Sequence, residues 1–271
     1  MATLTVNARG AVQVVARKHH WLVRVTHWLN IPILLGLTLS GISIYWAGPV
    51  YTHAPDANGN SDYLNDIGFW VARHEPWRHS YGAPETWLPN SHYSSSWVYD
   101  HFSLGTGILS SALQLHWLFA YLFLANGLLY LVGLGVGGGY KALLPRRTDL
   151  KDAFLMQRYY LGLPFAKLLR RPWPHPLVET KYNALQRLAY FAMPVAGAIA
   201  VLTGWAIHKP AQLGWLQALF GGYDYARLWH FGLLWLFVLF VIPHVLLVLV
   251  DGWDTMRSMV AGWTERPAKD L

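Results

Sequence analysis

The chain has 271 residues and a net charge of +7; 54% of the residues are hydrophobic and only 13% are charged, whereas charged residues make up about 25% of an ordinary soluble domain. It contains 15 Trp and 15 Tyr, residue types that gather at membrane–water interfaces. It has no cysteine, which excludes structural disulfides, thiolate-bound iron–sulfur clusters, covalently attached c-type haem and a cysteine nucleophile.

Four stretches are long and apolar enough to cross about 30 Å of hydrocarbon, which takes about 20 helical residues. We therefore predict an all-α integral membrane protein with a four-helix transmembrane bundle, forming one membrane domain over residues 1–271. The predicted spans are residues 21–50, 105–134, 185–207 and 228–251.

The distribution of Lys and Arg predicts the orientation. Residues 138–187 carry ten basic residues, whereas residues 51–105 carry only Arg73 and Arg78 against six acidic residues. Because basic loops stay on the cytoplasmic side, both termini and the connection 138–184 should be cytoplasmic, and the long connection 51–104 periplasmic. The chain should then be a multi-pass protein of the bacterial inner membrane. Its basic residues set the topology, so we expect no nucleic-acid partner.

Two of the connections have features of their own. Residues 150–169 mix apolar and basic residues and could lie along the lipid headgroups as an amphipathic segment. The predicted periplasmic connection is too long to be a simple link, and it is either a passive cap over the bundle or a docking surface for a periplasmic partner.

Four of the thirteen histidines, His27, His116, His230 and His244, lie inside the apolar spans. An ionisable residue in the bilayer is costly and by default suggests a functional site. A single buried histidine could instead be neutral and hydrogen-bonded to a neighbouring helix. For four such histidines, the depth of each in the membrane decides whether they could act in pairs.

The predicted topology places His27 and His244 near the cytoplasmic side, and His116 and His230 near the periplasmic side. Each depth thus has two histidines on different helices, as bis-histidine ligation of two haems requires. His230 and His244 are fourteen residues apart, close to four turns, so they share a helix face and lie about 21 Å apart along the axis.

Other residues of the spans could serve the same cofactors. Small residues could leave room for a flat macrocycle or allow close helix packing, and arginines at span ends could pair with haem propionates or reach to the interface. The small residues are Ser40, Gly41, Gly127, Gly197 and Gly204, and the arginines are Arg24, Arg187 and Arg227.

Several motifs resemble those of the Ni/Fe-hydrogenase-type cytochrome b family, which includes the formate dehydrogenase gamma and thiosulfate reductase cytochrome b subunits. They are Arg24-Val25-Thr26-His27-Trp28 with Leu39-Ser40-Gly41, Lys181-Tyr182-Asn183-Ala184-Leu185-Gln186-Arg187 with Thr203-Gly204, and Arg227-Leu228-Trp229-His230 with Pro243-His244. The resemblance covers the four spans and leaves the long first connection outside.

The resemblance implies two haem b groups, one held by His27 with His244 and the other by His116 with His230, the same pairs that topology predicts. It also implies electron exchange between a periplasmic redox subunit (a hydrogenase, a molybdenum enzyme or a cytochrome) and membrane quinone. Asn183 and Gln186 match its third-helix motif, so the resemblance implies a quinone site there, near His244. Alternatively, these two residues form a capping box at the start of the third span.

Our leading hypothesis is thus a dihaem cytochrome b subunit, embedded in lipid, of a quinone-linked oxidoreductase, in which Arg24 and Arg227 help to bind the haems. A second hypothesis is a self-contained haem oxidoreductase acting on a small diffusible substrate. A third is a transporter whose histidines form a proton relay.

Overall fold

The computed structural model describes residues 2–6, 12–17, 19–46, 79–80, 94–95, 101–104, 109–172, 182–251 and 253–267. Most of the predicted periplasmic connection lies outside these ranges. Within it the structure describes two-residue strands β3 (His79–Ser80) and β4 (Ser94–Ser95), which pair with each other, and residues 101–104.

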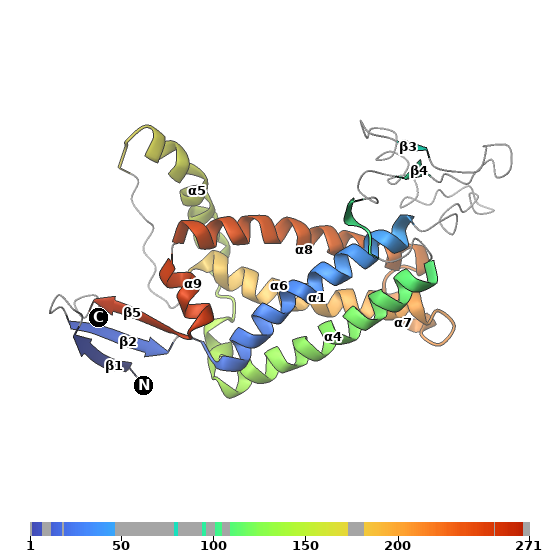
Figure 1. The fold of residues 1–271 in the computed structure, drawn as a ribbon, viewed down its shortest axis with the longest axis horizontal. Coiled ribbons are helices and arrows are strands. Elements are labelled where there is room, and N and C mark those ends of the chain that lie inside the picture. Colours follow the sequence, from blue (N-terminus) through green and yellow to red (C-terminus); the bar gives the residue numbers. More distant parts are fainter. Residues whose placement is uncertain are drawn as a thin grey trace. The chain divides into compact units, whose positions relative to one another are not determined.

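Four long helices dominate the described chain (Figure 1). They are α1 (Trp21–Trp46), α4 (Leu109–Val136), α6 (Ala184–His208) and α8 (Tyr223–Asp251). All four are long and apolar enough to cross a membrane, which confirms the four predicted spans. The predicted fourth span begins five residues later than α8, whose first turn contains Asp224.

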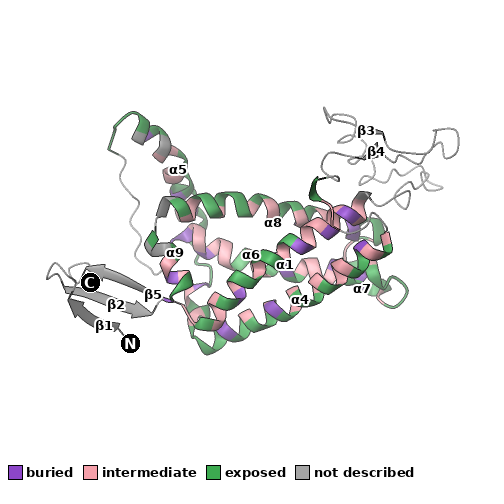
Figure 2. Cartoon of the chain, in the orientation of Figure 1, coloured by how far each residue is buried: buried purple, intermediate pink, exposed green. Residues whose placement is uncertain are grey.

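Many residues of these helices are exposed (Figure 2). They include large apolar residues, as contact with lipid requires. Leu35, Leu131 and Leu239 are each more than half exposed. In contrast, the polar side chains of Ser40, Ser43, Thr26, Asn126 and Thr203 in the same helices are buried. This pattern is the reverse of that in a soluble protein. The polar groups lie between the packed helices.

The chain divides into two compact units, each containing parts of all four long helices. One unit comprises His27–Asn126 and Ala200–Val238 and includes helix α7 (Gly214–Leu219). Its helices α1 and α4 approach closely: a Cβ on Gly36 would overlap the ring of Phe119, and Asn126 Nδ2 donates to Asn30 Oδ1 at 2.8 Å. Glycine at position 36 is therefore required for this packing.

The other unit comprises Met1–Thr26, Gly127–Ile199 and Leu239–Leu271. It contains the 3-10 helix η2 (Gly139–Ala142), helices α5 (Asp149–Leu168) and α9 (Trp253–Val260), and a three-stranded antiparallel sheet of order β1-β2-β5. The strands are β1 (Ala2–Val6), β2 (Val12–Arg17) and β5 (Trp263–Pro267). Helix α5 covers the stretch predicted to be amphipathic, whereas no strand was predicted.

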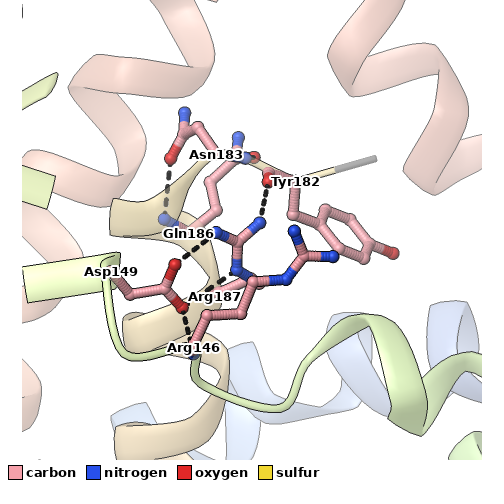
Figure 3. Close-up of polar contacts among 6 residues, drawn as sticks. All are labelled: Arg146, Asp149, Tyr182, Asn183, Gln186 and Arg187. Atoms are coloured by element: carbon pink, nitrogen blue, oxygen red, sulfur yellow. Dashed lines mark hydrogen bonds and ion pairs between the residues drawn. The ribbon is translucent and has the colours of Figure 1, made fainter. Parts of the chain in front are cut away.

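A buried ion pair joins α5 to α6 (Figure 3). Arg187 donates through Nε to Asp149 Oδ2 at 3.0 Å and through Nη2 to Asp149 Oδ1, and its Nη1 donates to the carbonyl of Tyr182 at 2.7 Å. Asp149 also accepts the backbone N–H of Arg146 at 2.8 Å. The hydrogen bonds from Arg187 lower the pKa of the Asp149 carboxyl below its ordinary value. The guanidinium of Arg187, one of the arginines considered for a haem propionate, is thus paired with Asp149.

We predict that Asp149→Asn lowers the free energy of unfolding in detergent by about 3 kcal/mol. This is the lower end of the cost of breaking a buried ion pair, and we choose it because Asp149 begins a helix outside the spans. The lowered pKa means that this contribution is present above the unfolded pKa of about 3.9 and is lost as pH falls through the folded value. The wild-type protein should therefore lose its advantage over Asp149→Asn only below about pH 4. Asp152→Asn, in the same first turn, is the control. Equal melting temperatures for the two variants at neutral pH would contradict the assignment.

Candidate functional site

His116 on α4 and His230 on α8 lie together in the unit that comprises His27–Asn126 and Ala200–Val238. Their ring centroids are 6.1 Å apart and the ring planes are inclined at 72°. The structure thus brings together the two histidines that sequence analysis paired at the periplasmic depth.

A hydroxyl group lies beside each ring. Ser40 Oγ is 3.0 Å from Nδ1 of His116, and Thr203 Oγ1 is 2.9 Å from Nδ1 of His230. Both hydroxyl-bearing residues are fully buried. Because each hydroxyl lies next to Nδ1, Nε2 of each imidazole is left for another partner.

A glycine follows each of these hydroxyl residues and lies against the same imidazole. A Cβ on Gly41 would lie 3.6 Å from Cε1 of His116, and a Cβ on Gly204 would lie 3.3 Å from Cε1 of His230. The latter distance is tighter than ordinary contact. Of the other small residues singled out from the sequence, Gly127 faces open space.

The separation of the two rings fits a metal between them. A metal–imidazole nitrogen bond is about 2 Å, which puts the metal about 3 Å from each ring centre and the two centres about 6 Å apart. The observed 6.1 Å agrees. Within the described residues there is no group of three or more His, Cys, Asp or Glu that could hold a metal ion. Two imidazoles alone suit an iron whose other ligands come from a porphyrin.

His27 and His244 belong to different units, His27 to that of His116 and His244 to that of the ion pair. The ring of His27 makes an edge contact with Trp28 (5.8 Å, 85°). The ring of His244 stacks on Phe240 (5.6 Å, 19°). Their pairing as ligands of a second haem stays a prediction.

The two arginines predicted to help bind haem have protein partners. Arg24 Nη1 donates to the carbonyl of Val260 at the end of α9, at 2.6 Å. Its guanidinium leaves no room for a side chain at Gly262, whose φ of +87° also favours glycine. Arg227 is buried, lies 3.6 Å from Asp224 and stacks on Tyr223. Contact of either arginine with a haem propionate stays a prediction.

Asn183 and Gln186, the predicted quinone residues, form a capping box at the start of α6 (Figure 3). Asn183 Oδ1 accepts the backbone N–H of Gln186 at 2.8 Å, and Gln186 Oε1 accepts the backbone N–H of Asn183 at 3.2 Å. The capping alternative therefore describes their side-chain oxygens correctly. Their amide NH2 groups remain as the donors that a quinone carbonyl would need.

Two contacts of the site are not predicted by the sequence. Ser40 is expected to make space but not to contact His116, and Thr203 is noted only within a motif. Outside the site, the pairing of Asp149 with Arg187 is not predicted either. The spacing of Ser40-Gly41 and Thr203-Gly204, each a hydroxyl residue followed by glycine inside an apolar helix, was the available signal.

Comparison with known proteins places these features in a family. The sequence model described as prokaryotic cytochrome b561 matches residues 18–262, which include all four spans and all four span histidines. No solved structure matches the chain.

Two relatives carry names of redox subunits. A protein of Azospira oryzae that carries the name of a protein-methionine-sulfoxide reductase subunit, YedZ1, is 28% identical over 243 residues, which is 89% of this chain and 94% of that protein. A protein of Azotobacter vinelandii that carries the name of a Ni/Fe-hydrogenase B-type cytochrome subunit is 31% identical over 96 residues, which is 30% of this chain and 40% of that protein. The chain therefore belongs to the prokaryotic cytochrome b561 family and is a multi-pass haem b protein of the bacterial inner membrane.

Proposed function

We propose that this protein is a dihaem cytochrome b subunit that transfers electrons between a periplasmic redox partner and the membrane quinone pool. The observation that carries the proposal is the half-buried pair of His116 and His230, whose ring separation of 6.1 Å suits a bis-imidazole iron site. When bound, haem b supplies an iron that can take up and release one electron.

The two imidazoles determine what kind of chemistry this site supports. A haem held by both His116 and His230 would leave no free position at which a small substrate could coordinate. Such a site favours electron transfer over chemistry on a diffusible molecule. The self-contained oxidoreductase is therefore the second candidate, and co-purification of a partner polypeptide would distinguish the two. The proton-relay transporter requires a chain without haem, which the family does not support.

The second haem of the proposal uses His27 and His244. Both lie in long apolar helices, α1 and α8, where an ionisable side chain needs a functional or structural reason. Neither is accompanied by an acidic residue in its own helix core that would favour a proton relay. Their predicted common depth supports the pair.

Quinone exchange is proposed near the start of α6, on the cytoplasmic side. Asn183 is buried and His244 belongs to the same unit. The capping box fixes both amide side chains, so Asn183 Nδ2 and Gln186 Nε2 are held as hydrogen-bond donors. A quinone carbonyl is an acceptor that such donors would bind.

The proposed partner is a redox protein on the periplasmic side. The names of the two relatives describe subunits of a methionine-sulfoxide reductase and of a hydrogenase, so an electron-exchanging partner is the kind of protein to expect. The connection 51–104 is the proposed contact surface. Its periplasmic side, with both termini cytoplasmic, rests on the distribution of Lys and Arg.

The haem assignment predicts the result of four substitutions. His116→Ala and His230→Ala should each remove the same haem, halving the haem content per chain, while His27→Ala and His244→Ala remove the other. A reduced-minus-oxidised spectrum and a haem assay of the purified protein measure this. His208→Ala, at the exposed end of α6, is the control and should retain both haems. Loss of both haems in His116→Ala, or a wild-type content of one, would contradict the pairing.

The topology predicts the activity of reporter fusions. Alkaline phosphatase, which needs disulfides that form only in the periplasm, should be active when inserted within residues 51–104 and inactive when fused after residue 271. A cytoplasmic reporter should show the opposite pattern. Phosphatase activity at the C-terminus would overturn the orientation, and with it the proposed sides of the two haems.

A further inference from the structure

The two ligand histidines of the proposed haem have matching surroundings, although they come from different helices. His116 lies against Ser40-Gly41 on α1, and His230 lies against Thr203-Gly204 on α6. In both cases the hydroxyl meets Nδ1, at 3.0 and 2.9 Å, and the glycine faces Cε1. Each imidazole thus packs against a hydroxyl residue and the glycine that follows it.

The hydrogen positions follow from the other contacts of the hydroxyl groups. Ser40 Oγ donates to the carbonyl of Gly36 on its own helix at 2.6 Å, and Thr203 Oγ1 donates to that of Ala200 at 3.1 Å. A hydroxyl has a single hydrogen, so each oxygen is left to accept one from the imidazole. Nδ1 is then the protonated nitrogen of both rings.

With Nδ1 protonated, the second ring nitrogen, Nε2, keeps its lone pair. The Nε2 lone pair of each ring is therefore available to a metal.

We propose that Ser40 and Thr203 are positioning residues that hold His116 and His230 as Nδ1–H tautomers, fix the rotation of their rings and lower the reduction potential of the haem between them. This inference rests on the proposed haem site. A hydrogen bond accepted from Nδ1–H increases the basicity of the ligating nitrogen, which stabilises ferric over ferrous iron.

Gly41 and Gly204 complete the two positions by leaving space beside the ring. At Gly204 an added Cβ would stand 3.3 Å from Cε1 of His230, whereas at Gly41 the corresponding distance of 3.6 Å is ordinary contact. Gly204→Ala should therefore turn the His230 ring and change the angle between the imidazole planes, and Gly41→Ala should change it less. The ferric electron paramagnetic resonance spectrum reports this angle.

Two pairs of variants test the hydroxyl groups in the full-length, haem-loaded protein. Ser40→Ala and Thr203→Val remove the hydroxyls, and Ser40→Thr and Thr203→Ser keep them. Ser43→Ala is the matched control, because Ser43 is equally buried on α1 but bonds the backbone of Leu39 and Leu104. The measurements are haem content, midpoint potentials by optical redox titration and ferric paramagnetic resonance.

Removing either hydroxyl should raise the potential of one haem while both haems stay bound. At a fixed ambient potential the reduced-to-oxidised ratio of that haem should rise on the order of tenfold, the lower end of the usual cost of such losses. The double variant should shift it further. Ser40→Thr, Thr203→Ser and Ser43→Ala should keep the wild-type potentials. If Thr203→Val loses haem, its restoration in Thr203→Ser supports the same role.

Unchanged potentials in Ser40→Ala and Thr203→Val, with haem retained, would overturn the positioning role and leave the haem site intact. An equal shift in Ser43→Ala would also overturn it, because the effect would then be general. A wild-type protein that lacks b-type bands would instead overturn the proposed function itself. The two failures are therefore distinguishable.

Discussion

A polar side chain within hydrocarbon must find its hydrogen-bond partner inside the protein, and this requirement organises the spans around the proposed haem site. Ser40 and Thr203 first satisfy their hydroxyl hydrogens on carbonyls of their own helices and then face the imidazoles. Asn126 bonds Asn30 on the neighbouring helix. The helices are thus rotated so that polar groups face one another, and the apolar side chains are left to face lipid. The position of the histidines follows from that rotation.

The same requirement makes the proposed haem site suitable for electron transfer. The rings of His116 and His230 contact hydroxyl groups of two other helices, so little reorganisation would be needed when the charge on a metal held between them changed. A rigid site of this kind exchanges electrons without exchanging ligands. Both relatives carry names of subunits of redox enzymes, which agrees with an electron-transfer role.

The spans were predictable because length and hydropathy are properties of single segments. The pairing of His116 with His230 was predictable because their positions along the second and fourth spans put them at the same depth in the membrane. The contacts of Ser40 and Thr203 were not, since they depend on how each helix is rotated about its axis. The pair of Asp149 and Arg187 joins residues 38 apart and needs the fold of the connection between them. Arg24 was predicted to bind a haem, whereas in the structure it donates a hydrogen bond to the end of α9. That helix is too short and polar to be recognised beside the spans.

The three strands β1, β2 and β5 were not predicted, and their order along the chain has a consequence for how the protein is synthesised. Strand β2 pairs on one side with β1, its neighbour in sequence, and on the other with β5, in a register that sets Val15 opposite Glu265. The hairpin of β1 and β2 is synthesised before the first span, but its third strand leaves the ribosome only after the fourth. That edge of β2 therefore cannot pair with β5 until all four spans have been synthesised, so the three-stranded sheet is completed last.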